Sequence, residues 1–136
     1  MNTLNKDSLN LAANKKSVTI LGSTGSIGSN TLDLISRNRD AYDIKALTAN
    51  KNVIKLAQQA KEFNVDMAVI ADSTLYSELK LALSGTNIIV GAGLEGLIEA
   101  ADMPAQWVMS SIVGAAGLGP TLTAIRRGAT IALANK

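Results

Sequence analysis

The sequence predicts an α/β fold of the doubly wound, Rossmann-like type, with a mostly parallel sheet and helices on both of its faces. Six short apolar runs alternate with segments of helical periodicity along the 136 residues, and this alternation is typical of a parallel sheet covered on both sides. The first run is followed by three glycines, at positions 22, 25 and 28, and then by an amphipathic stretch. The composition, 47% hydrophobic and 18% charged, is that of a globular domain.

In the first half of the chain, three apolar runs predict strands. They cover residues 17–21, 43–48 and 66–70. Two intervening stretches carry apolar residues at helical spacing. These predicted helices cover residues 27–38 and 52–63. The first half therefore consists of two consecutive strand–helix–strand units.

The second half of the chain continues the same alternation. A helix over 73–83 is expected to begin at a cap supplied by Asp72 or Ser73. Pro120 suits the first turn of the last helix, and Gly128 suits its end. The other predicted elements are strands over 87–90, 107–110 and 130–134 and helices over 93–101 and 120–127. Right-handed crossovers between such strands give a doubly wound sheet.

Composition and charge exclude several classes of function. The chain has neither cysteine nor histidine, which excludes disulfides, Ser-His-Asp triads, Cys-His pairs and histidine metal sites within it. A net charge of +2 is too small to predict a nucleic-acid or membrane-surface partner. No apolar run reaches the length of a membrane span or a signal peptide, so we expect a cytoplasmic protein. Residues 1–15 are polar and predict a flexible lead-in.

The glycine loop between the first strand and the first helix predicts a phosphate-binding site. Gly22 allows a tight turn, Gly25 lets the backbone approach a pyrophosphate, and Gly28 lets the helix lie close to the sheet. The helix N-terminus that follows attracts phosphate through its free N–H groups and its dipole. Three hydroxyl side chains in the loop could add donors: Ser23, Thr24 and Ser26. The alternative is a tight strand-to-helix turn that binds nothing.

The end of the second strand predicts NADP rather than NAD. NAD-binding loops place an Asp or Glu about 20 residues past the glycines, where it binds the ribose 2′-hydroxyl. This chain has no acid there and has Asn50, Lys51 and Asn52 instead. A lysine with two amide side chains suits a 2′-phosphate. The alternative for Lys51 is an ordinary exposed lysine at a helix start.

Elsewhere the chain offers weaker signals. The small residues within 109–117 could let a flat ring or a ribose lie against the backbone, although a tight strand–helix connection would need them as well. Lys136 could meet an anionic substrate or could be only a charged terminus. The 11 Asp and Glu residues form no cluster with metal-ligand spacing. We therefore predict no metal site and no general acid or base.

Four segments taken together resemble one family. They are LGSTGSIG at 21–28, ALTANKN at 46–52, IVGAAGL at 112–118 and LANK at 133–136. In this order they resemble the N-terminal, NADPH-binding domain of 1-deoxy-D-xylulose 5-phosphate reductoisomerase, over about residues 16–136. The resemblance implies an NADPH-dependent oxidoreductase of isoprene biosynthesis by the non-mevalonate pathway. Such enzymes convert 1-deoxy-D-xylulose 5-phosphate to 2-C-methyl-D-erythritol 4-phosphate.

The resemblance also implies roles for individual residues. The cofactor-binding positions are Gly22, Thr24, Gly25, Ser26, Ile27, Asn50, Lys51, Asn52 and Asn135, and the substrate-binding position is Lys136. Those in the glycine loop hold the phosphates, and 50–52 receive the ribose with its 2′-phosphate. Asn50 is a departure, because many members have glycine there; asparagine tolerates a left-handed backbone better than most residues.

The family continues past the LANK segment with catalytic and C-terminal domains that are absent from this chain. The resemblance implies a divalent metal, Mg or Mn, and typically a homodimer only for the full-length enzyme, whose substrate is a phosphorylated ketose. The 136-residue chain is therefore expected to bind NADPH and to be inactive alone. Two alternatives stay open: a stand-alone nucleotide-sensing or regulatory module without catalysis, and a domain of another NADP-linked reductase.

Overall fold

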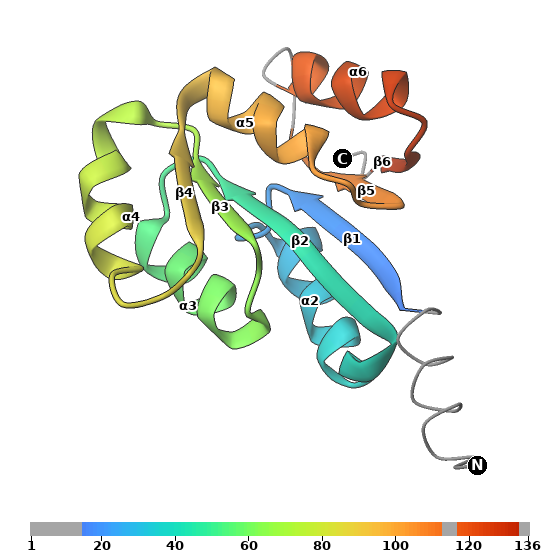
Figure 1. The fold of residues 1–136 in the computed structure, drawn as a ribbon, viewed down its shortest axis with the longest axis horizontal. Helices are drawn as coiled ribbons and strands as arrows, with labels where there is room; N and C mark the ends of the chain where they lie inside the picture. The colour runs from blue at the N-terminus through green and yellow to red at the C-terminus, as the bar shows by residue number, and fades with distance from the viewer. Residues whose placement is uncertain (1–14, 113–116, 134–136) are drawn as a thin grey trace, which may run out of the picture.

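Six strands form one parallel sheet in the computed structural model, which describes residues 15–112 and 117–133 (Figure 1). The strands are β1 (Lys16–Leu21), β2 (Tyr42–Ala49), β3 (Met67–Ile70), β4 (Ile89–Ala92), β5 (Trp107–Ser110) and β6 (Thr130–Leu133). Their order across the sheet is β4-β3-β2-β1-β5-β6, and every neighbouring pair is parallel. The chain builds outward from β1 to β4 and then resumes on the other side of β1. This reversal confirms the predicted doubly wound sheet.

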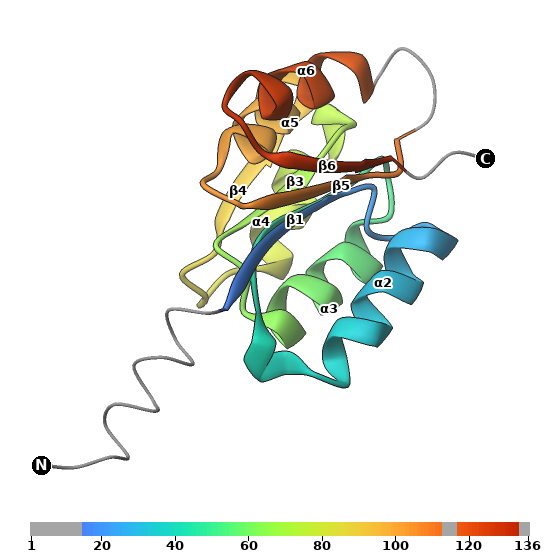
Figure 2. The same cartoon turned by 90° about the vertical axis from the view of Figure 1, so that its right-hand side faces the viewer.

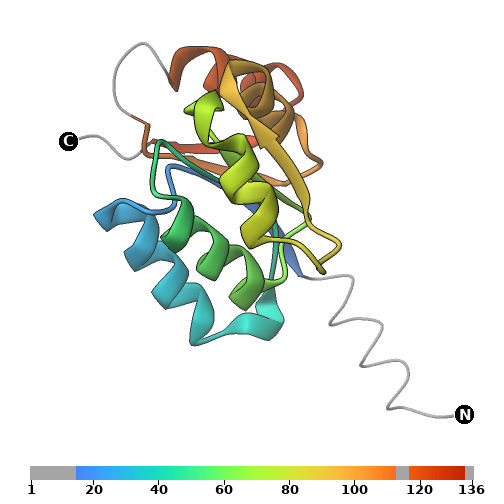
Figure 3. The same cartoon turned by 90° about the vertical axis from the view of Figure 1, so that its left-hand side faces the viewer.

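Helices cover both faces of this sheet. They are α2 (Ser26–Ser36), α3 (Val53–Phe63), α4 (Tyr76–Ala82), α5 (Gly93–Asp102) and α6 (Leu118–Arg126), with 3-10 turns at Arg39–Ala41 and Ser73–Leu75. Figure 2 shows α2 and α3 on one face and α5 and α6 on the other. Helix α4 packs against α3 on the first face (Figure 3). Within the described ranges, no helix has the length and apolar character that crossing a bilayer requires.

The core consists of two aliphatic clusters, one on each face of the sheet. Ile20, in the cluster beneath α2 and α3, and Leu21, in the cluster beneath α5 and α6, are both fully buried. They are neighbours in β1 and face opposite sides because successive strand residues alternate. With both faces covered, the inner parts of the central strands are buried on both sides, as the continuous runs in the sequence predict.

One irregularity interrupts the alternation in β2. Val18 of β1 lies opposite Ile44, but the next residue, Thr19, lies opposite Ala46, so Lys45 is an extra residue on β2. This is a β-bulge. As a result Ile44 and Leu47, three residues apart, both face the same core cluster.

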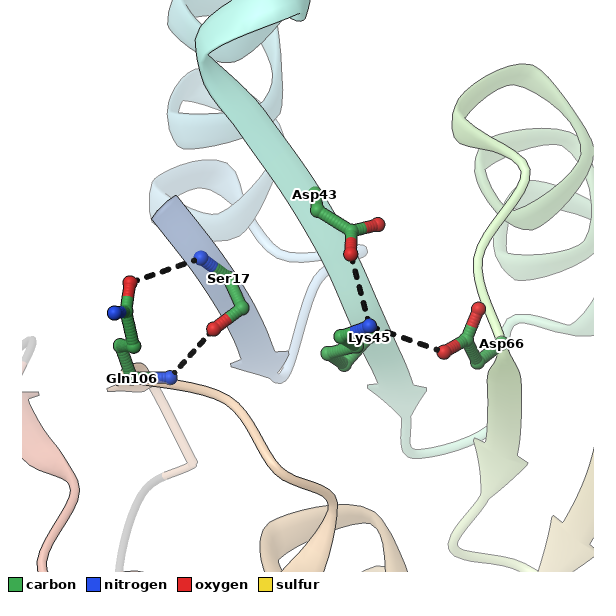
Figure 4. Close-up of polar contacts among 5 residues, drawn as sticks. All are labelled: Ser17, Asp43, Lys45, Asp66 and Gln106. Atoms are coloured by element: carbon green, nitrogen blue, oxygen red, sulfur yellow. Dashed lines mark hydrogen bonds and ion pairs between the residues drawn. The ribbon is translucent and has the colours of Figure 1, made fainter. Parts of the chain in front are cut away.

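Polar contacts join the strands near the edge of the sheet where they begin (Figure 4). The Lys45 Nζ atom lies 2.8 Å from the Asp43 carboxylate and 3.5 Å from that of Asp66. The hydrogen bond to Asp43 is the main reason why the pKa of Lys45 is raised. The Gln106 amide donates to the Ser17 hydroxyl at 2.8 Å, and the Ser17 amide donates to the Gln106 side-chain oxygen at 3.4 Å. These contacts lie at the opposite edge from the glycine loop.

Several predicted bounds differ from the observed ones. Helix α2 ends at Ser36, two residues before the predicted end, and α6 begins at Leu118, two residues before the predicted start. The fourth strand lies at Ile89–Ala92 rather than 87–90. It includes Gly91, where a Cβ would come within 3.2 Å of the Met67 and Val69 side chains, so this position has little room for a side chain. Helix α4 begins at Tyr76, after a 3-10 turn. Of the two predicted caps it is Asp72 whose side chain accepts a hydrogen bond, from the Thr74 amide, at the start of that turn.

Candidate dinucleotide-binding site

The glycine loop is fixed to the ends of two strands. Gly22 has a φ of +86°, a left-handed conformation that favours glycine. Its amide donates to the backbone and side-chain oxygens of Thr48 at the end of β2, at 3.1 and 2.9 Å. The Ser111 hydroxyl, beyond the end of β5, donates to the carbonyl oxygens of Leu21 and Gly22 at 2.9 Å. The loop is therefore held at the point between β1 and β5 where the winding of the sheet reverses.

The other two glycines differ in what surrounds them. A Cβ on Gly28 would lie 2.4 Å from the Gly22 carbonyl oxygen and 2.6 Å from the Ser23 Cα, so a side chain has no room there. This agrees with the prediction that Gly28 allows close packing of the helix. A Cβ on Gly25 would meet nothing closer than 3.9 Å. Gly25 is exposed, so the described residues give no steric reason for a glycine at this position.

The start of α2 carries N–H groups that no side chain caps within the described residues. Its N-cap is Gly25, and its first turn contains no acidic residue. The first N–H groups of a helix have no partners inside the helix. Ser26 is exposed and Ile27 half-buried at this end, so their N–H groups and the helix dipole are directed at an accessible position. This arrangement suits a phosphate group.

A pocket of about 320 Å³ lies against the glycine loop. Its walls come from the ends of several strands: Gly22, Thr24, Gly25, Thr48, Ala49, Asn50, Ala71, Leu97, Ser111 and Ile112. Ligands of open α/β sheets bind in such a crevice at the reversal point. A larger cavity of about 450 Å³ lies on the α2 face, between Leu34, Trp107 and Met109. It is largely apolar and does not include the glycine loop.

The turn between β2 and α3 brings the predicted 2′-phosphate residues to the same edge. Asn50, Lys51 and Asn52 are all exposed. The Asn52 side-chain oxygen accepts from the Lys55 amide at 3.1 Å and so caps α3. The Asp72 amide donates to the Asn50 carbonyl at 3.0 Å, which places Asp72 beside this turn. Hydrogen bonds from Thr74, with a smaller contribution from the Lys51 charge, lower the pKa of Asp72.

The prediction that the Ser23 hydroxyl could donate to a phosphate is wrong. The Ser23 side chain is fully buried, and its hydroxyl donates to the Gln59 side-chain oxygen at 2.8 Å. It is therefore directed into the protein and away from the pocket. Thr24 and Ser26 stay accessible.

Three residues that shape the loop were not predicted from the sequence: Thr48, Lys55 and Gln59. Ser111 lies in the small-residue segment predicted to face a ligand, but its hydrogen bonds to the loop were not predicted. A polar residue at the end of an apolar strand was the available signal for Thr48. No local pattern marks Lys55 or Gln59, because both lie on an ordinary amphipathic helix.

Two predicted positions, Asn135 and Lys136, lie outside the described residues, as do 1–14 of the predicted lead-in and 113–116 of the small-residue segment. Within the described ranges, no group of three or more His, Asp or Glu side chains gathers to hold a metal ion.

Comparison with known proteins gives a consistent family assignment. The family model for 1-deoxy-D-xylulose 5-phosphate reductoisomerase matches residues 18–136. Curated enzymes of that name are 57% identical over 121 residues in Zymomonas mobilis and 60% identical over 124 residues in Rhizobium meliloti. These alignments cover 89% and 90% of this chain but 31% and 32% of the relatives. The chain thus spans about a third of the length of the relatives it matches.

Solved structures agree with this assignment. The Zymomonas mobilis reductoisomerase in complex with NADPH superposes with a TM-score of 0.87 at 56% identity, covering 89% of this chain and 32% of that one. A DOX-P reductoisomerase in complex with NADPH, fosmidomycin and magnesium gives a TM-score of 0.83 at 41% identity, covering 88% and 30%. The fold described above is therefore also found in solved structures.

Proposed function

Because this chain belongs to the 1-deoxy-D-xylulose 5-phosphate reductoisomerase family, we propose that residues 16–136 form its NADPH-binding domain. One observation carries the proposal: an uncapped helix N-terminus and an open space at Gly25 meet at the reversal point of the sheet. The open space at Gly25 is explained if a pyrophosphate approaches the backbone there. The solved relative with the higher identity is a complex with NADPH.

We assign the cofactor's parts to two segments of this edge. Backbone N–H groups from Thr24 to Ile27 would hold the pyrophosphate. Asn50, Lys51 and Asn52 would hold the 2′-phosphate, with the Lys51 ammonium as its counter-charge. Thr48 and Ser111 would support the loop through hydrogen bonds without contacting the phosphate groups of the cofactor. Asn135 and Lys136 stay predictions, as cofactor and substrate contacts respectively.

For the full-length enzyme we propose the conversion of 1-deoxy-D-xylulose 5-phosphate to 2-C-methyl-D-erythritol 4-phosphate. NADPH, when bound, supplies a hydride, and the residues described here would orient it and hold its phosphates. Magnesium, named with three solved relatives, has no candidate ligand cluster within the described residues. We expect the 136-residue chain to bind the cofactor without turning over the substrate. A cytoplasmic location and a homodimer stay predictions.

Titration of the chain with NADPH and NADH tests the proposal. The signal is the cofactor's own fluorescence, since Trp107 begins β5, at the opposite edge of the sheet. We expect NADPH to bind about tenfold more tightly than NADH, because a charge-assisted contact contributes about 1.5–3 kcal/mol. Equal affinities would contradict the assignment of the 2′-phosphate. If neither NADPH nor NADH binds, the proposed cofactor site is wrong. Both candidate functions, the enzyme domain and the sensing module, would then be contradicted.

A stand-alone nucleotide-sensing module is the second candidate function, and it would bind NADPH in the same way. The sequence downstream of Lys136 in the natural protein separates the two. A further segment with clustered carboxylates supports the reductoisomerase, and a stop codon at this point supports the module.

A further inference from the structure

Helix α3 is joined to the glycine loop at two points. The Gln59 side chain accepts from the Ser23 hydroxyl at 2.8 Å and donates from Nε2 to the Ser23 carbonyl oxygen at 3.0 Å. The Lys55 ammonium donates to the carbonyl oxygen of Thr24 at 3.0 Å. Two consecutive loop residues are thus held by side chains one helical turn apart on α3.

The Gln59 contact lies in a place where its loss would be costly. Ser23 is fully buried and Gln59 is 9% exposed. A buried hydroxyl and a buried carbonyl both need partners, and a glutamine amide supplies an acceptor and a donor together. Among the described residues the Ser29 hydroxyl also lies near the Ser23 carbonyl oxygen, at 3.4 Å, which is long for such a bond.

The same helix also begins at the segment assigned to the 2′-phosphate. Asn52 caps α3, directly after Asn50 and Lys51. The helix is well anchored, because Leu56 and Ala60 are fully buried beneath it and α4 packs against its side (Figure 3). The turns into α2 and α3 leave the sheet on the same side (Figure 2).

We propose that Gln59, assisted by Lys55, is a positioning residue for the cofactor, which sets the phosphate loop relative to the 2′-phosphate segment. Helix α3 is then a rigid brace between the two subsites. This inference rests on the proposed function. Neither side chain needs to touch the cofactor, because each acts through a loop residue. The described geometry preorganises the loop, and preorganisation raises affinity by lowering the ordering cost of binding.

The test compares Gln59→Met with Gln58→Met in the 136-residue chain. Gln58 is the exposed neighbour on the same helix and serves as the matched control. Two probes are titrated at a temperature where circular dichroism shows each variant to be folded. NADPH contacts both subsites, and adenosine 2′-monophosphate, followed by NMR, contacts only the 2′-phosphate segment.

We expect Gln59→Met to weaken NADPH about tenfold and to leave the affinity for adenosine 2′-monophosphate within twofold, because only the loop is released. Lys55→Met should weaken NADPH about threefold, since its contact is partly exposed. Gln58→Met should change neither affinity. Ser23→Ala added to Gln59→Met should cause little further loss, because both changes break the same contact.

Two results would overturn the proposal. If folded Gln59→Met binds NADPH as tightly as wild type does, the contact between Gln59 and Ser23 stabilises the core without positioning the cofactor. Equal weakening of both probes would mean that the substitution disturbs α3 itself. If wild type binds neither probe, the proposed function is wrong, and the inference about Gln59, which rests on it, is wrong with it. If Gln59→Met does not fold, Ser23→Ala replaces it, with an expected threefold loss for NADPH only, and the same two results would overturn the proposal.

Discussion

Gly28 lies against Gly22 so closely that a methyl group on Gly28 would come within 2.4 Å of the Gly22 carbonyl oxygen. The first turn of α2 can therefore follow the loop only if position 28 has no side chain. The nearby backbone at Ser23 is itself held by Thr48 and Gln59. It has little freedom to move aside.

Gly28→Ala is expected to lower the free energy of unfolding by about 1–3 kcal/mol, the usual cost of overpacking. Urea denaturation followed by circular dichroism measures it. Gly119→Ala is the control, since a Cβ there meets nothing closer than 3.9 Å. That change should leave stability unchanged or raise it by up to about 1 kcal/mol, as alanine favours a helix. An equal loss in both variants would contradict the steric explanation.

Gly25→Ala should separate binding from folding. The described residues leave room for this methyl group, so the urea midpoint should fall only by the modest cost of replacing a glycine N-cap with alanine. NADPH affinity should fall about tenfold or more, because the methyl group occupies the approach to the pyrophosphate. Fluorescence titration measures the affinity. A variant that binds NADPH as wild type does would remove Gly25 from the site.

Lys51→Glu should abolish the preference for NADPH. The glutamate would repel the 2′-phosphate, and its carboxylate could accept a hydrogen bond from the ribose hydroxyl of NADH. We expect NADPH to weaken about tenfold or more and NADH to bind as well as before or better. The control is Lys61→Glu, an equal change of charge at an exposed position near the other end of α3. If both variants lose NADPH equally, the effect is one of net charge and the assignment of Lys51 is wrong.

Thr19→Val is expected to stabilise the protein. Thr19 is fully buried in the middle of β1, and its hydroxyl has no hydrogen-bond partner among the described residues. Valine has nearly the same shape and removes a desolvated polar group whose burial costs about 1–3 kcal/mol. The free energy of unfolding should rise by about 1 kcal/mol. A decrease would show that the hydroxyl has a partner, such as a buried water.

The stabilising contribution of Lys45 should be lost at alkaline pH, where its ammonium group loses its proton. Its pKa in the folded state is raised above the ordinary 10.5, mainly by the hydrogen bond to Asp43. The stabilisation is therefore complete below pH 10.5 and is lost as the pH rises through the higher folded value. The contribution should be below about 1 kcal/mol, since the contact is partly exposed.

The check is the difference in unfolding free energy between wild type and Lys45→Met, measured across this range. It should shrink as the pH rises. A difference independent of pH would mean that the lysine acts through packing alone.

The parts of the site that follow from local sequence were predictable, and those that depend on distant contacts were not. Gly22 has to be glycine because the turn gives it a left-handed backbone, and Gly28 because a side chain on the first turn of the helix would collide with the loop. Gln59 is 36 residues from Ser23 in the chain, and its own helix shows only that it lies nearer the apolar face than Gln58, without indicating which residue it meets. Such a pairing exists only after β1 and β2 have brought the two segments together.

The same distinction holds for the fold. Strand β3 was predicted almost to the residue because it is a continuous apolar run. Strand β4 was displaced by two residues, since its inner part contains Gly91, whose place in a strand depends on the Met67 and Val69 side chains beside it. The bulge at Lys45 leaves no mark in a run that reads as an ordinary strand.

That bulge means that β2 has one residue more than its pairing with β1 requires. If Lys45 were deleted, Ile44 and Ala46 would become neighbours that face opposite cores, as a regular strand demands, and every other pairing between β1 and β2 could persist. The pairing of β2 with β3 begins at Ala46 and could also persist, although the Asp66 amide would lose the Lys45 carbonyl to which it donates at 3.0 Å. The deletion would remove the two ion pairs of Lys45, to Asp43 and to Asp66, and would leave Thr48 opposite Leu21, beside the loop that it supports.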